Sequence, residues 1–315
     1  MRKTTKTIFV VIPLALILSI IGIYYLLPEV TFKLVQKIER SRAGFDQHSI
    51  EVADLHIEYL EGGQGDVLIL LHGFGANKDN WTRIGRYLTP HFRVIAPDLP
   101  GFGESTRNPE ANYSIAAQSE RLYTFVRALK LKNFHLAGSS MGGAISGTYA
   151  ARYPKDVKSL WLIAPGGVAS ADPGEIRSML DEGRTNPLIA ESVEGYEQLL
   201  DFVFVKQPFI PPPIKRYLAQ EAIDHYPLNQ KIYKQIHNAA DTPPLEVTLS
   251  GLPVPTLILW GASDQVLHAS GGGILQSVMP KAKLVIMEDV GHLPMIETPK
   301  ESAKLYLNFL GITDN

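Results

Sequence analysis

The sequence predicts an α/β fold, in which a mainly parallel sheet is covered by helices on both faces and a helical cap is inserted between two core strands. Short, uninterrupted apolar runs alternate with helical patterns along the 315 residues, as buried parallel strands and their crossover helices require. This alternation stops after Gly166 and resumes after Gly251. Apolar residues make up 45% and charged residues 20% of the chain, so we expect a folded core rather than a disordered chain.

The strands can be placed in order along the chain. Residues 54–60 alternate between apolar and polar side chains, which predicts an edge strand after a short strand at 49–52. Continuous apolar runs of five or so residues are typical of strands that are buried on both faces of a sheet. Such runs predict buried strands at 66–71, 92–96, 134–137, 159–163, 256–260 and 283–287.

Helices are predicted between and after these strands. Residues 114–130 should form one helix, with Ser114 as its N-cap, and residues 144–152 a second. The last helix should begin at Thr298, because Thr298 and Glu301 have the spacing of a capping box and a proline occupies the first helical position.

The stretch 166–250 breaks the alternation of strands and helices. It contains helical patches, an aromatic group at Phe202, Phe204 and Phe209, and three consecutive prolines at 211–213. A segment inserted between two core strands of a parallel sheet lies beside the strand ends. We therefore expect this insertion to form a cap over one end of the sheet.

The N-terminal segment is expected to be a membrane anchor. Residues 8–27 carry no charge, and at about 1.5 Å per residue a helix of this length spans the hydrocarbon core of a bilayer. No small-residue cleavage site follows, which favours an uncleaved anchor over a signal peptide. Residues 1–45 would then comprise the anchor and a juxtamembrane helix, and residues 46–315 the folded domain. The basic residues before the span suggest a bacterial inner-membrane location with the domain outside the cytoplasm.

The composition argues against several classes of partner and site. Lys plus Arg (30) nearly balances Asp plus Glu (32), and no basic run occurs, so nucleic-acid binding is not expected. The chain has no cysteine, which excludes disulfides, a thiol nucleophile and cysteine-ligated metal centres. No motif in the sequence implies a metal or another cofactor.

Ser140 lies in the pattern expected of a catalytic nucleophile. The strand at 134–137 leads into GSSMGG and then a helix, which places G-x-S-x-G at a sharp strand-to-helix turn. Glycines two residues before and after the nucleophile leave room for its strained backbone, and only Ser140 has Gly138 and Gly142 in those positions. The spacing matches neither a dinucleotide-binding loop nor a P-loop.

A serine nucleophile needs a histidine base and an acid that orients the base. In this architecture the acid and then the histidine follow the serine in the chain. Asp264 and His292 lie just past the last two predicted strands, at the sheet edge where open α/β sheets bind ligands. They are the expected acid and base, with Asp172 as the alternative acid and His268 as the alternative base.

Two backbone N–H groups are expected to stabilise the oxyanion of a tetrahedral intermediate. One belongs to Met141, directly after the nucleophile and at the start of a helix. The other should come from the HGFG loop after an early strand, and Phe74 is the expected donor. His72 in that loop and Asp98 in the PDLPG segment are expected to brace their loops rather than take part in chemistry.

With these motifs in their observed order, the chain resembles the α/β-hydrolase superfamily from about Glu51 to Phe309. The HGFG loop, DLPGFGES, GSSMGG, WGASDQV and VGH carry this resemblance. Within the superfamily it is similar to the membrane-anchored monoacylglycerol lipase branch, through HGFGANKDNW (72–81), GSSMGGAISGTYAARYP (138–154) and WGASDQVLHASG (260–271). Bacterial lipases of similar layout also fit.

The resemblance implies a triad of Ser140, Asp264 and His292, with Phe74 and Met141 as oxyanion donors. It further implies a serine ester hydrolase that forms an acyl-enzyme, with a lipid or small ester as substrate and monoacylglycerol as the best single choice. A carbon–carbon bond hydrolase with the same triad remains an alternative. A more distant alternative is a non-enzymatic binding protein on the same fold.

Overall fold

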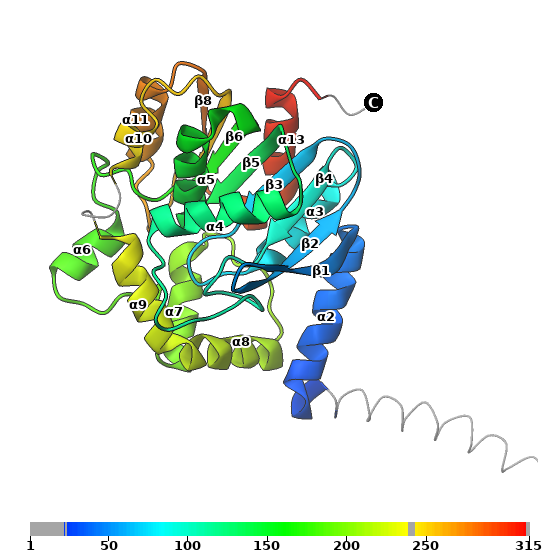
Figure 1. The fold of residues 1–315 in the computed structure, drawn as a ribbon. Coiled ribbons are helices and arrows are strands. Elements are labelled where there is room, and N and C mark those ends of the chain that lie inside the picture. Colours follow the sequence, from blue (N-terminus) through cyan, green and yellow to red (C-terminus); the bar gives the residue numbers. More distant parts are fainter. Residues whose placement is uncertain (1–21, 23, 239–242, 313–315) are drawn as a thin grey trace, which may run out of the picture.

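An eight-stranded sheet forms the centre of the structure, a computed structural model that describes residues 22, 24–238 and 243–312. Its strand order is β1-β2-β4-β3-β5-β6-β7-β8 (Figure 1). β1 and β2 form an antiparallel hairpin, β2 pairs antiparallel with β4, and the remaining neighbours are parallel. The strands are β1 (Phe45–Val52), β2 (Leu55–Gly62), β3 (Val67–Leu71), β4 (Arg93–Pro97), β5 (Phe134–Ser139), β6 (Val157–Ile163), β7 (Thr256–Gly261) and β8 (Ala282–Met287).

This sheet confirms the predicted α/β fold class and its buried strands. β1 begins at Phe45, earlier than the predicted start at residue 49, because it pairs with β2 along its whole length, from Phe45 opposite Gly62 to Val52 opposite Leu55. Most residues of β1 between its two buried ends are exposed, so the apolar pattern of the sequence underestimates its length.

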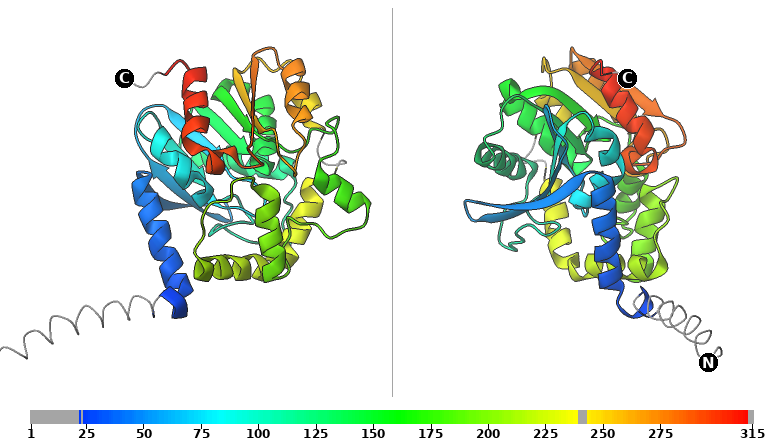
Figure 2. Two further views of the ribbon diagram at one scale, coloured as in Figure 1. Left: turned by 180° about the vertical axis from the view of Figure 1, so that it is seen from behind. Right: turned by 90° about the vertical axis from the view of Figure 1, so that its right-hand side faces the viewer.

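Helices cover both faces of the sheet. In β3, Ile69 and Leu71 pack in one buried cluster, whereas Leu68 and Leu70 pack in the other, as alternation along a strand requires. The first cluster lies under α4 (Ile115–Ala128), α5 (Met141–Arg152), α10 (Leu245–Thr248) and α11 (Ser270–Val278). The second lies under α3 (Thr82–Leu88), α12 (Pro294–Glu297) and α13 (Pro299–Phe309), which Figure 2 shows on the opposite side.

The insertion between β6 and β7 supplies the helices below the sheet in Figure 1. Leu245 and Leu249, in and after its last helix α10, are buried in the core beside α5. The preceding helices gather beyond the carboxyl ends of the parallel strands. They are α6 (Glu175–Asp181), α7 (Val193–Val203), α8 (Pro212–Asp224) and α9 (Tyr226–Ile236).

Helix α2 (Pro28–Arg42) precedes the sheet and packs beside α8 (Figure 1). Its Arg40 holds Asp79 with two bonds, from Nε to Oδ1 at 2.6 Å and from Nη2 to Oδ2 at 2.7 Å. Gln36 Nε2 donates to the same carboxylate at 2.7 Å. The ring of Phe32 lies 5.2 Å from that of Tyr217 in α8. These contacts fix α2 to the domain.

The predicted membrane span, residues 8–27, falls mostly outside the described residues. Within the part of the chain that the structure describes, no helix combines the length and the apolar character needed to cross a bilayer. The expected localisation, a single-pass inner-membrane protein with its domain outside the cytoplasm, is contradicted by this finding. The first long described helix, α2, has 15 residues and carries charges along its length.

Two predicted helix starts have different outcomes. Ser114 caps α4 as predicted, its Oγ accepting from the N–H of Ala117 at 3.3 Å. Helix α13 begins at Pro299, but Thr298 makes no side-chain cap. Its hydroxyl donates instead to the carbonyl of Pro294 at 3.0 Å, because α12 ends immediately before and offers that acceptor. The capping box predicted at Thr298 is therefore wrong.

Candidate active site

Ser140 occupies the sharp turn between β5 and α5. Its backbone has φ 54° and ψ −118°, a strained conformation for a residue with a side chain. A Cβ at Gly138 would lie 2.1 Å from the carbonyl oxygen of Gly142, and one at Gly142 would lie 2.3 Å from that of Leu71. Side chains cannot be fitted at either glycine without moving backbone, which agrees with the space argument from the sequence.

Hydrogen bonds from the neighbouring strand fix this turn. The N–H of Ser140 donates to the carbonyl of Ile163 at the end of β6, at 3.0 Å, and the N–H of Gly166 donates to the carbonyl of Ser140 at 2.9 Å. The turn is thus anchored where the insertion begins. These hydrogen bonds hold Ser140 in a backbone conformation that a residue with a side chain does not favour by itself.

The structure brings Asp264 and His292 together in a buried pair. Nδ1 of His292 lies 2.8 Å from Oδ2 of Asp264, and the two residues are 4% and 7% exposed. Asp264 also accepts from the indole N–H of Trp260 at 3.0 Å and from the N–H groups of Val266 and Leu267 at 2.8 and 3.0 Å. Four donors therefore hold the carboxylate, which fixes the ring of His292 and directs its Nε2 away from the acid.

The turn that carries His292 is tied to the cap. The N–H of His292 donates to the carbonyl of Val203 at the end of α7, at 3.0 Å. Glu297 accepts from the N–H of Gly291 at 2.9 Å and, through its other oxygen, from the N–H groups of Val205 and Lys206. Glu297 could not be recognised from the sequence, because nothing in its local pattern shows that it bridges two distant loops.

The alternative acid and base lie elsewhere. Nδ1 of His268 is 3.6 Å from Oδ2 of Asp172, and the two side chains are 49% and 70% exposed. They face each other on the surface, and neither lines the cavity that Ser140 and His292 share. The structure thus pairs the preferred acid with the preferred base, and it places Ser140 and His292 on one cavity.

The two segments expected to supply the oxyanion donors lie beside Ser140. Met141 is the first residue of α5, so its N–H has no partner within the helix. A Cβ at Gly73 would lie 3.3 Å from the Cβ of Ser140, which places the loop that carries Phe74 directly against the serine. The ring of Phe74 packs between those of Phe102 and Tyr233, with centroid distances of 5.9 and 5.5 Å.

His72 braces this loop. Its Nε2 accepts from the N–H of Leu99 at 3.0 Å, so Nδ1 carries the proton and donates to the carbonyl of Gly73 at 2.8 Å. Complete burial lowers the pKa of His72 below its ordinary value, which keeps the ring neutral. Both ring nitrogens are occupied, as expected for a structural histidine.

A buried ion cluster supports the neighbouring segment. Asp98 is 0% exposed and accepts from the N–H of Lys78, from Nζ of Lys78 and from the N–H of Glu104, each at 2.7 Å. Nζ of Lys78 also lies 2.6 Å from Glu104. Burial opposes the charge of Lys78, but the two carboxylates raise the pKa of its amine above the ordinary value. Asp98 braces its loop as predicted, while the role of Lys78 was missed.

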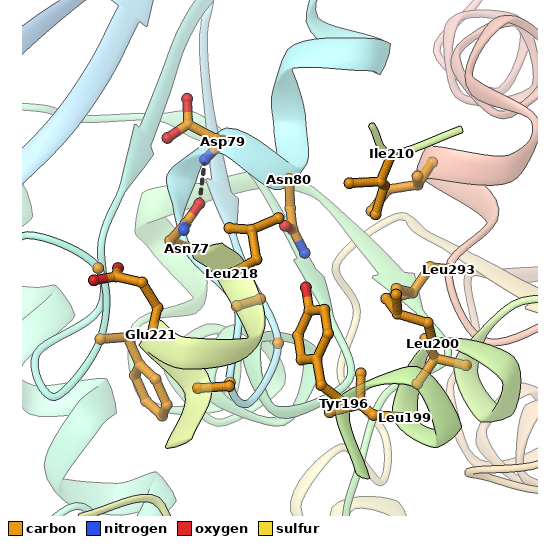
Figure 3. A pocket seen from close by; sticks show the side chains of 18 of the residues that line it. Asn77, Asp79, Asn80, Tyr196, Leu199, Leu200, Ile210, Leu218, Glu221 and Leu293 are labelled. Carbon is orange, nitrogen blue, oxygen red and sulfur yellow. Dashed lines mark hydrogen bonds between the residues drawn. The ribbon is translucent and has the colours of Figure 1, made fainter. Parts of the chain in front are cut away.

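A cavity of about 510 Å³ opens beside Ser140 and His292. In Figure 3 polar side chains, including Asn77, Asp79 and Glu221, lie on one side of it. The other side is apolar and is formed by α7, the segment before α8 and the loop after His292. Its side chains include Leu199, Leu200, Ile210 and Leu293. The cavity therefore has a polar end and an apolar end.

Helix α2 completes one wall of the same cavity. Phe32, Val35 and Gln36 line it, on the face of α2 that Arg40 and Asp79 hold against the domain. This is the helix that was expected to be juxtamembrane. No local pattern in the sequence of α2 indicates that it lines a cavity shared with Ser140 and His292, which lie more than 90 residues further along the chain.

Comparison with known proteins agrees with this architecture. Residues 66–299 match the family model of the α/β hydrolase fold. The chain is 41% identical to "Lipase 1" of Psychrobacter immobilis, over 90% of each sequence. It is 30% identical to human "Monoacylglycerol lipase ABHD6", over 95% of this chain and 92% of the relative.

Among solved structures, it is similar to "a membrane phospholipase A, a novel bacterial virulence factor". The two are 42% identical with a TM-score of 0.88, and the match covers 97% of this chain and 99% of the other. The eight-stranded sheet, the matched family model and a relative of 41% identity show that the chain belongs to the α/β hydrolases. Within them it falls in the lipase-like branch of carboxylic ester hydrolases.

Proposed function

We propose that this chain hydrolyses lipid esters with a single acyl chain in the reacting site, through a triad of Ser140, His292 and Asp264. The observation that carries the proposal is the buried bond of 2.8 Å between His292 and Asp264, on a cavity that Ser140 also lines. A serine nucleophile, a histidine base and a buried acid that orients the base are the groups that nucleophilic acyl transfer requires.

In the first half of the reaction, the Oγ of Ser140 attacks the ester carbonyl while Nε2 of His292 takes its proton. Asp264 stabilises the resulting imidazolium. The N–H groups of Met141 and Phe74 donate to the oxyanion of the tetrahedral intermediate. Collapse of the intermediate breaks the ester C–O bond, and His292 returns its proton to the departing alcohol.

In the second half, a water molecule attacks the acyl-enzyme. His292 takes a proton from this water, and a second tetrahedral intermediate forms over the same two donors. Collapse breaks the bond to Ser140 Oγ, which recovers its proton from His292. The products are a fatty acid and an alcohol, and no group beyond these residues and water is needed to balance the steps.

The two ends of the cavity support a lipid ester as substrate. The apolar end, formed by side chains such as Leu200, Ile210 and Leu293, can bury an acyl chain. The polar end can hydrogen-bond a glycerol headgroup. The names of the relatives as lipases support the same class, and monoacylglycerol is the simplest ester of this shape.

The experiment is hydrolysis of an ester panel by the full chain. The panel holds p-nitrophenyl esters of increasing chain length, 1- and 2-monoacylglycerols, triacylglycerols and a vinylogous diketone. Ser140→Ala should abolish turnover. Ser139→Ala is the matched control. Ser139 directly precedes Ser140, and its hydroxyl is buried without a hydrogen-bond partner among the described residues.

The outcomes separate the candidate functions. Monoacylglycerol turnover that Ser140→Ala removes and Ser139→Ala retains supports the proposal. Diketone turnover with inert esters would assign the chain to carbon–carbon bond hydrolysis. Failure of a fluorophosphonate to label Ser140 in folded protein would show that the serine is not an activated nucleophile.

A further inference from the structure

Arg107 is an unpaired cation at the polar end of the cavity. It lies in the loop between β4 and α4 and lines the same cavity as Ser140 and His292. Its Nε is buried and has no hydrogen-bond partner among the residues that the structure describes. Within the described part of the chain, no carboxylate forms an ion pair with its guanidinium.

Two other basic side chains near this end are paired with carboxylates. Lys78 is bound by Asp98 and Glu104, and Arg40 is bound by Asp79. Arg107 differs from both, because burial lowers the pKa of its guanidinium without a bonded carboxylate to offset the effect. An arginine side chain stays charged in proteins even so. A half-buried charge that lacks a partner in the free protein is suited to bind an anion from a ligand.

The chemistry of the cavity indicates which anion Arg107 would bind. Since the apolar end is filled by an acyl chain under the proposed function, the group at Arg107 belongs to the headgroup of the same ester. A guanidinium presents a planar fork of N–H donors that matches the oxygens of a phosphate. A neutral glycerol would leave the charge of Arg107 uncompensated.

Resting on the proposed function, we propose that Arg107 binds a phosphate in the headgroup of the substrate, so that the enzyme prefers a single-chain acyl glycerophosphate to the neutral monoacylglycerol. Arg107 then selects the substrate and takes no part in the acyl transfer at Ser140.

Glu221 lies at the same end and is exposed. Its negative charge acts on Arg107 without an ion pair. A phosphate monoester and an ethanolamine phosphodiester share the phosphate that Arg107 would bind, but only the second also brings an ammonium group that suits a carboxylate. Glu221→Gln therefore distinguishes the two headgroups: it should raise kcat/KM for the monoester relative to kcat/KM for the diester.

The test compares kcat/KM for three substrates with the same acyl chain: 1-monoacylglycerol, 1-acylglycerol 3-phosphate and 1-acylglycerophosphoethanolamine. The measured quantity is the ratio of each phosphate ester to the neutral ester, for the full chain and for Arg107→Gln. Arg216→Gln is the matched control, since Arg216 is an exposed arginine of α8 that does not line this cavity.

The expected result is a ratio above one in the unaltered enzyme and a fall in this ratio of about tenfold or more in Arg107→Gln, the size of one lost charge-assisted hydrogen bond. Arg107→Lys should recover part of it, and Arg216→Gln should leave it unchanged. A ratio that Arg107→Gln does not alter, or equal losses on all three substrates, would overturn the proposal.

A second measurement does not depend on lipid turnover. Glycerol 3-phosphate should inhibit p-nitrophenyl butyrate hydrolysis by the unaltered enzyme more strongly than glycerol does, and Arg107→Gln should remove the difference. Equal inhibition by both compounds would count against a phosphate site. Loss of all esterase activity in Ser140→Ala but an unchanged phosphate ratio in Arg107→Gln would leave the proposed function standing and refute only the headgroup assignment.

Discussion

The buried pair between Lys78 and Asp98 should dominate the stability of the segment beside the active site. The two side chains are 1% and 0% exposed, and Nζ lies 2.7 Å from Oδ2. The variant Lys78→Met keeps the length and apolar stem of the side chain but removes the ammonium group. Asp98 would then be a buried carboxylate without a counter-charge.

The expected loss of stability depends on the hydrogen bonds that Asp98 keeps in this variant. Removing one partner of a buried ion pair costs about 3–5 kcal/mol. Asp98 would still accept from the backbone N–H groups of Lys78 and Glu104, both at 2.7 Å, so we expect the lower end, about 3 kcal/mol. The lost bond to Glu104 adds little, because that side chain is 55% exposed. At an unfolding entropy of about 2.1 cal/mol/K per residue, the change corresponds to about 4–5 °C in Tm for a protein of this size.

Urea and thermal unfolding, followed by circular dichroism, measure this change. Lys158→Met is the matched control: Nζ of Lys158 lies 2.7 Å from Asp66, the same distance, but the pair is 37% and 59% exposed. It should cost at most about 1 kcal/mol. The double variant Lys78→Met/Asp98→Asn should recover part of the loss, because it removes the stranded charge and keeps an amide oxygen to accept from the backbone N–H groups. The reasoning is refuted if Lys78→Met costs no more than Lys158→Met, or if the double variant is less stable than the single one.

Three further predictions concern the triad, the turn and the cap. Asp264→Asn should lower kcat for p-nitrophenyl butyrate by about 10⁴-fold with the fold intact, because the neutral amide no longer stabilises the imidazolium of His292; a loss under about tenfold would contradict the assigned acid. Gly138→Ala should reduce the same activity by about a hundredfold or more, since its Cβ would lie 2.1 Å from a backbone oxygen, and near-normal kinetics would show that the turn can relax. Burial alone would raise the pKa of Glu246, but hydrogen bonds from its own backbone, Ser170 and Ala169 hold it below the ordinary 4.5. Because the folded pKa is depressed, this stabilisation is present above 4.5 and is lost as the pH falls through the folded value. Urea midpoints should therefore drop more steeply on acidification in the unaltered protein than in Glu246→Gln, and parallel curves would contradict this.

The sheet and the turn at Ser140 could be predicted because their signals are local. A buried parallel strand is a short apolar run, and a G-x-S-x-G turn is defined within five residues. Chain order then restricted the acid and base to the loops after the last strands, where Asp264 and His292 form a bonded pair.

The parts that could not be predicted depend on distant contacts. Glu297 joins the His292 turn to the cap, and Lys78 meets Asp98, through bonds between residues far apart in the chain. Arg107 resembles any polar loop residue until the cavity around it is known. The hydroxyl of Thr298 donates to a carbonyl of the preceding short helix. The capping-box spacing is present in the sequence, but it could not show that this competing acceptor lies nearby.

The cavity wall formed by α2 determines how the enzyme can be cut for study. A shortened chain that begins after Arg42 would keep every residue of the proposed triad, yet it would lack Phe32, Val35 and Gln36 and leave Asp79 without its arginine. Such a fragment can still cleave short, water-soluble esters while its selectivity for long acyl chains changes. Substrate profiles measured on truncated protein would then describe an opened site rather than the native one.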